Sequence, residues 1–217
     1  KNGVYRLKYL IVSLMALSGV WAQGKPEDAQ SVIRKVQNKY KKTDSFSFSF
    51  DYRFKWKLTG KSQSAQGKLF FKKENNIRYE LGQQLNITNG ESVWQYSEVN
   101  NQVIIDKLKK NSRSLFMPKY FLYDYLEKFI AEVIKTETIN GRLVYVLKLD
   151  PRDRDDFVQS MKIWVPSDTW ITQKIEYADL EGNQVTYEFT HVEIDQPMNM
   201  NLFTFTPETG MDVIDLR

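Results

Sequence analysis

The stretch from Phe46 to Leu58 alternates strictly between apolar and polar side chains. Six of its seven even-numbered residues are aromatic, and the seventh is also apolar: Phe46, Phe48, Phe50, Tyr52, Phe54, Trp56 and Leu58. Because side chains alternate between the two faces of a strand, the pattern predicts one long β-strand with an aromatic face and a polar face. Such a strand spans on the order of 40 Å, roughly twice the usual length, and favours a large curved sheet. The aromatic face is either an ordinary core or the wall of an apolar pocket.

Residues 1–22 have the features of a secretory signal peptide. Basic residues lie at positions 1, 6 and 8, an apolar run covers 10–17, and the small residue Ala22 precedes the expected cleavage position. The apolar run is too short for a membrane-spanning helix, which needs about 20 residues, so a retained anchor is the weaker alternative. We therefore expect the mature chain, residues 23–217, to be secreted across the inner membrane into the periplasm.

The composition excludes several classes of function. The chain has no Cys, which excludes a disulfide, a thiol nucleophile, a thiolate metal site and a lipid-modified cysteine, and favours a bacterial periplasm. Loss of the three basic residues of the signal peptide lowers the formal net charge from +4 to +1, which gives no support for nucleic-acid binding. No linker or repeat divides residues 23–217, so a single domain is expected.

The remaining patterns predict one early helix and an antiparallel meander. Ala29, Val32, Ile33, Val36 and Tyr40 fall on one helical face. Further strands are expected after the long one, with Asn-Gly or Gly-Asn turns between several of them: 64–73, 77–81, 85–88, 92–97, 102–108, 132–139, 143–149, 161–165, 170–178 and 184–191.

A second helix is predicted after Pro118. Its apolar face is unusually broad: Phe121, Leu122, Tyr125, Leu126, Phe129 and Ile130, widened by Tyr120 and Tyr123. Such a helix is either a core element that plugs the sheet or a cover over a surface that is at times occupied by something else.

No group of residues has the pattern of a catalytic or metal site. His191 is the single histidine, and it has no nucleophile motif or second histidine beside it. The acidic run 150–156 lacks the Gly and distal Glu of a calcium loop, and its arginines neutralise the acids, so a solvated turn is predicted. A pair of carboxylates for sugar hydrolysis stays open, because nothing in the sequence singles one out. No cofactor is expected.

Two segments carry a resemblance to a known family. The hairpin Thr88-Asn89-Gly90-Glu91-Ser92-Val93-Trp94-Gln95-Tyr96 and the tail Phe203-Thr204-Phe205-Thr206-Pro207-Glu208-Thr209-Gly210-Met211-Asp212-Val213 are similar to motifs of the periplasmic lipoprotein carrier LolA family. The strand beginning Gly67-Lys68-Leu69-Phe70-Phe71 adds to the likeness, which extends over residues 27–217.

The resemblance implies an unclosed antiparallel β-barrel, or half-barrel, with a helical lid over a hydrophobic cavity. It implies a monomeric chaperone that receives acylated lipoproteins from an inner-membrane ABC transporter and passes them to an outer-membrane acceptor, without catalysis. The expected acyl-chain cavity is lined by Phe46, Phe48, Phe50, Tyr52, Phe54, Ile77, Tyr79, Leu81, Trp94 and Tyr96. The expected lid residues are Phe121, Leu122, Tyr125 and Phe129. Lys73-Glu74 stands where the family has Arg-Pro, so Lys73 is expected to hold the lid through a point charge instead of a guanidinium.

Two other functions stay open on the sequence alone. One is a sensor or acceptor of lipoproteins with the same fold, although an acceptor of this kind normally carries a lipid-modified Cys. The other is an envelope hydrolase, which needs a nucleophile or metal set that the sequence does not reveal.

Overall fold

A computed structural model describes residues 27–108 and 128–217. Its main feature is a 12-stranded sheet. The strands are β1 (Ser45–Lys55), β2 (Ser62–Lys72), β3 (Asn76–Leu81), β4 (Gln84–Asn89), β5 (Ser92–Ser97), β6 (Gln102–Lys107), β7 (Phe129–Ile139), β8 (Arg142–Pro151), β9 (Val158–Pro166), β10 (Lys174–Asp179), β11 (Gln184–Ile194) and β12 (Asp212–Asp215). The helices are α1 (Ala29–Lys42) and the short 3-10 helix η1 (Met200–Phe203).

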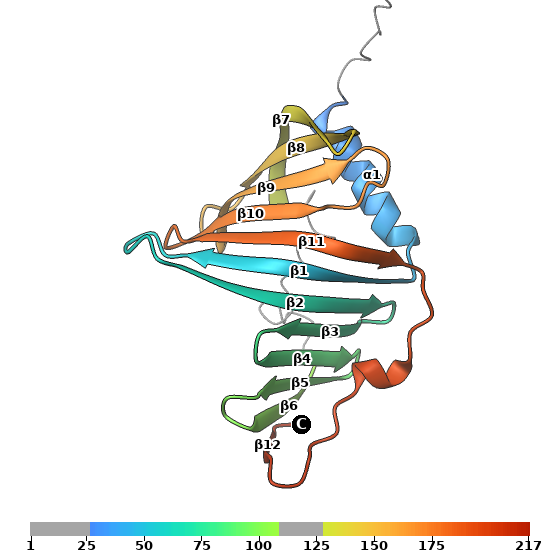
Figure 1. Cartoon of the computed structure of the whole chain (residues 1–217), viewed down its shortest axis with the longest axis vertical. Coiled ribbons are helices and arrows are strands. Elements are labelled where there is room, and N and C mark those ends of the chain that lie inside the picture. The colour runs from blue at the N-terminus through green and yellow to red at the C-terminus, as the bar shows by residue number, and fades with distance from the viewer. Residues whose placement is uncertain (1–26, 109–127) are drawn as a thin grey trace, which may run out of the picture.

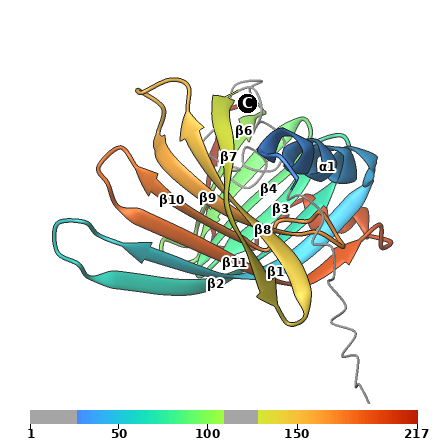
Figure 2. The same ribbon diagram turned by 90° about the horizontal axis from the view of Figure 1, so that it is seen from above.

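The strand order is β12-β6-β5-β4-β3-β2-β1-β11-β10-β9-β8-β7, as Figure 1 shows from bottom to top. The two strands at the ends of this order, β12 and β7, do not pair with each other, so the sheet is unclosed. Figure 2 shows that the sheet curves strongly, with α1 on its inner side. The mostly β, unclosed architecture predicted from the sequence is therefore confirmed.

The predicted long strand is β1, at the centre of the sheet between β2 and β11. It ends at Lys55, before the predicted end at Leu58, because the chain turns there: the Gly60 amide donates to the Trp56 carbonyl, and the Trp56 amide donates to the Lys61 carbonyl. The predicted Asn140-Gly141 hairpin is also present, with φ of 51° and 75° at its two residues, the left-handed pair that a type I′ turn requires.

Helix α1 forms where the helical periodicity predicts it. Asp28 is its N-cap, with the carboxylate accepting a hydrogen bond from the Ser31 amide at 2.8 Å, and basic residues occupy the last turn, where they oppose the helix dipole. The five residues of the predicted apolar face are all buried. Tyr40 packs edge-on against Phe46, with ring centroids 5.6 Å apart, and this contact connects the end of α1 to the start of β1.

The sheet has two faces that bury different clusters. We call the face that carries the even-numbered residues of β1 the inner face; it packs with α1 into the larger hydrophobic cluster. On the outer face, a second cluster lies under residues 198–211, which we call the C-terminal strap. The strap contains η1 and leads into β12, which pairs with β6 in parallel. The prediction of a purely antiparallel meander was wrong at this point, because the strap crosses the outer face and returns in the direction of β6.

The predicted helix after Pro118 was wrong at its C-terminal end. Phe129 and Ile130 are the first residues of β7, in register with Pro151 and Asp150 of β8. Phe129 is buried and Ile130 is 57% exposed, an alternation that belongs to a strand. In the sequence, Phe129 and Ile130 also fit the helical spacing of the apolar residues before them. Their pairing with β8 is what makes them a strand.

Candidate ligand-binding face

The aromatic residues of β1 form a row along the inner face and make ring contacts with one another and with neighbouring strands. Phe46 stacks on Phe48 and on Phe71 of β2, with centroids 5.8 and 4.7 Å apart. Phe50 stacks on Tyr79 of β3 at 5.5 Å and is tilted against Tyr187 of β11 at the same distance. Rings from three strands, β1, β3 and β11, therefore meet around Phe50, which is 2% exposed.

Gly67 of β2 makes this arrangement sterically feasible. It is the register partner of Phe50 on one side and of Leu81 on the other. A Cβ atom at position 67 would lie 2.2 Å from Phe50 Cζ and 2.4 Å from the Glu80 carbonyl oxygen. The missing side chain lets the Phe50 ring lie across β2 and reach Tyr79.

Burial along β1 decreases from one end to the other. The aromatic side chains at the end beneath α1 are buried through Phe50, whereas Tyr52 and Phe54 are half-buried and Trp56 is 38% exposed. Leu81 is likewise half-buried and packs against the edge of the inner cluster. Figure 2 shows the β1–β2 and β10–β11 hairpins extending away from α1 at this end. We call it the open end of the inner face, because here the aromatic row emerges from the core into solvent.

Hydrogen bonds tie two hairpins together at the open end. The Lys57 amide donates to Asn183 Oδ1 at 3.1 Å. Asn183 in turn donates from its own amide and from Nδ2 to the two carboxylate oxygens of Asp179, at 2.8 and 3.0 Å. Asp179 is 6% exposed, and a third donor, the Glu181 amide, also reaches it. These bonds hold the β1–β2 hairpin beside the β10–β11 hairpin, which fixes the width of the aromatic surface there.

Four tyrosines gather between the buried and open ends. Tyr52 and Tyr187 are register partners with ring centroids 5.2 Å apart. Tyr79 lies within hydrogen-bonding reach of the Tyr187 hydroxyl, and Tyr177 lies on the neighbouring strand β10. Burial raises the pKa of Tyr79, Tyr177 and Tyr187 far above the ordinary value, so all three phenols stay neutral. The apolar inner face thus contains a group of uncharged hydrogen-bonding hydroxyls.

These raised pKa values predict that the protein loses stability in alkali. In the unfolded chain the phenols lose protons above about pH 10, whereas in the folded chain they keep them, so rising pH favours unfolding. The free energy of unfolding should fall by about 1.4 kcal/mol per pH unit for each of the three tyrosines. Urea unfolding between about pH 9 and about pH 11 measures this slope. Tyr187→Phe should make it shallower by the contribution of one tyrosine, about 1.4 kcal/mol per pH unit. A slope unchanged by Tyr187→Phe would contradict the burial of this phenol.

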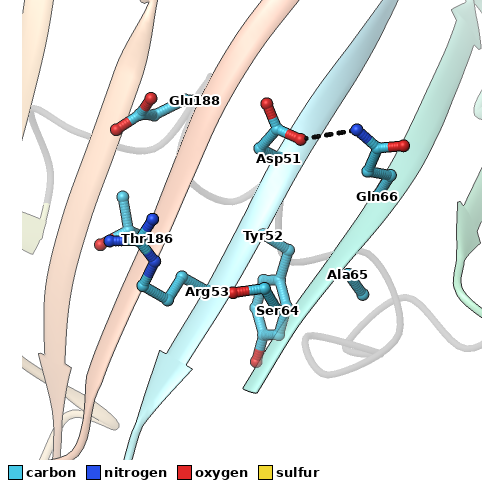
Figure 3. Close-up of a pocket in the computed structure, with 8 residues that line it drawn as sticks. All are labelled: Asp51, Tyr52, Arg53, Ser64, Ala65, Gln66, Thr186 and Glu188. Carbon is cyan, nitrogen blue, oxygen red and sulfur yellow. Dashed lines mark hydrogen bonds between the residues drawn. The ribbon is translucent and has the colours of Figure 1, made fainter. Parts of the chain in front are cut away.

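The outer face of the same strands has a different character. It has a hollow of about 350 Å³, drawn in Figure 3. Six of its lining residues are polar side chains of the outer face: Asp51, Arg53, Ser64, Gln66, Thr186 and Glu188. Gln66 donates to Asp51 across it at 3.0 Å. This surface is polar and charged, so the aromatic surface of β1 belongs to the inner face alone.

The structure places eight of the ten expected cavity residues on the inner face: Phe46, Phe48, Phe50, Tyr52, Phe54, Ile77, Tyr79 and Leu81. The placement of Trp94 and Tyr96 in the same cavity was wrong, because both belong to the outer cluster under the C-terminal strap. Thr88 of β4 is the register partner of both Ile77 and Val93, which puts Val93 on the inner face and the next residue, Trp94, on the outer one.

The expected lid falls mainly outside the described residues: Phe121, Leu122 and Tyr125 do so, and Phe129 lies in β7. Lys73 follows β2 and forms an ion pair with Asp44, and its amide donates to the Asp44 carbonyl at 2.9 Å. Both side chains of this pair are more than half exposed, so it contributes little to stability.

Sequence reasoning missed an equally important part of the inner face. Val185, Tyr187 and Phe189 of β11 stand opposite Phe54, Tyr52 and Phe50. The alternation of these residues was visible in the predicted strand 184–191, but the pairing of β11 with β1 was not. A pairing across more than 130 positions leaves no local signal in a single sequence.

The residues considered for catalysis form no site. His191 is exposed, and the nearest polar contact of its Nδ1 is Thr190 Oγ1 at 3.2 Å. Residues 152–156 of the acidic run lie in the turn between β8 and β9, as predicted, and there the Asp155 amide donates to Asp153 Oδ1. Asp150 and Pro151 are instead the last residues of β8. Within residues 27–108 and 128–217, no three His, Cys, Asp or Glu side chains are grouped so that they could hold a metal ion. The same residues include no helix with the length and apolar character needed to span a membrane.

One large unclosed sheet, with an α-helix on its inner side and an apolar inner face, defines the architecture of this mostly β protein. The family model described as "Outer membrane lipoprotein carrier protein LolA" matches residues 41–206. The chain belongs to the LolA family.

Several individual proteins are similar to the chain. An uncharacterized protein of Methanocaldococcus jannaschii is 29% identical over 207 residues, and the match covers 94% of this chain but only 59% of that protein. The outer-membrane lipoprotein carrier protein of Pseudomonas paraeruginosa is 28% identical over 156 residues, which cover 70% of this chain and 72% of the carrier. The crystal structure of an uncharacterized conserved protein from Thermus thermophilus shares the fold, with a TM-score of 0.57 at 8% identity, over 86% of this chain and 98% of that one.

Proposed function

We propose that this chain is a periplasmic carrier that binds the acyl chains of lipoproteins on the open end of its inner face. The observation that supports it most is the course of the aromatic row: it begins in the core at Phe46 and emerges half-exposed at Tyr52 and Phe54. A purely structural sheet has no need to continue its aromatic face beyond the elements that cover it. The family adds the chemistry of the ligand, an acylated lipoprotein.

The energetics favour a surface of this kind. Burial of an acyl chain yields about 0.8 kcal/mol per CH2, so complete shelter of one long chain is worth on the order of 10 kcal/mol. A carrier that fully buried several chains would release them too slowly. Rigid rings lose little rotamer entropy when they bind a chain. Because they cover only part of each acyl chain, the affinity stays moderate and the exposed part can be bound by the acceptor.

The proposal includes partners and a place of action. The carrier receives lipoproteins from an inner-membrane ABC transporter and passes them to an outer-membrane acceptor, as a monomer and without catalysing a reaction. Residues 1–22 act as a cleaved signal peptide, and residues 23–217 form one carrier domain. No cofactor takes part.

Replacement of Phe54 by Asp tests the site. Phe54 is half-buried at the open end, so the variant should fold, but it places a carboxylate where an acyl chain would lie. We expect a loss of at least about tenfold in affinity for a long-chain fatty acid or an environment-sensitive apolar dye, measured by fluorescence titration.

Ser64→Asp is the matched control. Ser64 pairs with Arg53 on the outer face, one position along β2 from the residue opposite Phe54. The Ser64→Asp variant introduces the same charge on the outer face and should leave the affinity for the fatty acid or dye unchanged. Equal affinity of both variants and the unmodified protein would refute an acyl site at the open end.

A further inference from the structure

The inner face changes from apolar to polar along one row of register partners. Phe48 pairs with Leu69, Leu69 with Tyr79, Tyr79 with Asn86, and Asn86 with Gln95. The next row of register partners, which starts at Phe50, ends in Gln84, Ser97 and Gln102 on β4, β5 and β6. We call Gln84, Asn86, Gln95 and Gln102 the amide strip. Tyr79 stands at the boundary between the aromatic row and this strip.

The side chains at this boundary have hydrogen-bonding capacity to offer. Asn86 and Gln95 are half-buried, and neither carboxamide hydrogen-bonds to another group in the part of the chain that the structure describes. The neighbouring Tyr79 and Tyr187 hydroxyls carry two protons, and a hydrogen bond between them would use only one, so the pair keeps a donor. Tyr52, half-buried beside Tyr187, adds another hydroxyl.

The boundary lacks positive charge. None of the inner-face positions of β1–β6 and β9–β11 is a Lys or Arg in the structure as described; the basic residues of β1 and β2, such as Arg53 and Lys68, project from the outer face. The inner side of the described strands carries three carboxylates. Asp106 lies one row away from Asn86, Asp212 of β12 already accepts a hydrogen bond from Gln102 Nε2 at 2.5 Å, and both oxygens of Asp179 already accept hydrogen bonds. An anionic head group placed here would be desolvated without a cation to compensate.

Resting on the proposed function, we infer that the tyrosines and the amide strip form a subsite for the neutral polar part of an acylated ligand, in which its ester or amide carbonyls accept hydrogen bonds. Phenol hydroxyls and carboxamide NH2 groups donate to carbonyl oxygens without a charge of their own. The acyl chains then lie along Tyr52 and Phe54, and the linkage group lies at Tyr79 and Asn86. The subsite selects neutral diacyl compounds over phosphate-bearing lipids with the same chains.

The test compares three probes on the full chain: a diacylglycerol, the phosphatidic acid with the same acyl chains, and an apolar dye. The unmodified protein should bind the diacylglycerol at least about tenfold tighter than the phosphatidic acid. The double variant Tyr79→Phe with Tyr187→Phe removes both hydroxyls, so neither is left unpaired. It should lose about five- to tenfold in diacylglycerol affinity and keep its dye affinity.

Tyr145→Phe is the matched control. Tyr145 is a buried inner-face tyrosine that stacks on Trp170, 5.9 Å between centroids, away from the boundary. Its variant should bind all three probes normally. Asn86→Leu provides a second route to the same subsite, at a half-buried position, should the double tyrosine variant fold poorly.

The outcomes separate the two proposals. Dye binding with no preference for the neutral lipid, or with no loss in either subsite variant, overturns the subsite and leaves the acyl carrier standing. Equal loss in Tyr145→Phe also overturns it, because the effect would then be general. Absence of binding for every probe overturns the carrier, and the subsite with it.

Discussion

Replacement of Gly67 by Ala is expected to lower the free energy of unfolding by about 3 kcal/mol, the upper part of the range for overpacked cores. The new methyl group would lie 2.2 Å from the Phe50 ring and 2.4 Å from the Glu80 carbonyl oxygen. The ring can rotate away only by giving up its stacking on Tyr79, and the carbonyl is fixed by strand pairing. Chemical denaturation at neutral pH measures the effect.

Two comparisons isolate the cause. Ser64→Ala lies on the same strand on the outer face and should change stability by less than about 0.5 kcal/mol. In a Phe50→Ala background the ring is gone, so Gly67→Ala should cost at least about 1 kcal/mol less than it does alone. Strictly additive effects would show that the ring does not lie across Gly67.

Replacement of Phe203 by Ala is expected to cost about 4 kcal/mol. Phe203 is fully buried in η1, and it packs in the outer cluster that holds the C-terminal strap against Ile87, Trp94 and Val103. The cavity left by the ring would lie between the strap and β4–β6. Denaturant unfolding gives the loss of stability, and hydrogen exchange should show faster exchange in β4–β6 before the rest of the sheet.

Phe205→Ala is the variant with which the stability loss of Phe203→Ala is compared. Phe205 belongs to the same strap and contacts Tyr96 at 5.2 Å between centroids, but it is only half-buried. Its variant should lose about 1 kcal/mol, in proportion to its smaller burial. A Phe203→Ala loss no greater than this would mean that the strap is not packed on the outer face.

Local patterns were sufficient to predict most of the fold. The period-two alternation of β1, the helical face of α1 and the Asn140-Gly141 turn each depend on residues close in sequence, and the structure confirms all three. The errors arose where a distant segment decides the outcome. Phe129 starts a strand because β8 pairs with it, and β12 is parallel because the strap crosses the sheet.

The candidate site was predictable in part for the same reason. One strand, β1, carries enough of the inner face that its alternation identifies Tyr52 and Phe54. The face of each β5 residue depends on the register of the β4–β5 hairpin: Val93 pairs with Thr88 of the inner face, so Trp94 lies on the opposite face. The contribution of Tyr187 needed the pairing of β1 with β11, and the role of Gly67 needed the ring of Phe50 in place.

Uptake of an acyl chain by the inner face is tested most directly with a photoactivatable long-chain fatty acid, cross-linked to the protein at saturation and mapped by mass spectrometry. The predicted result is labelling at the open end of the inner face, on Tyr52, Phe54 and Leu81, which competing unlabelled fatty acid abolishes. Labelling confined to the outer face around Asp51 and Glu188, or labelling that does not saturate, would contradict it.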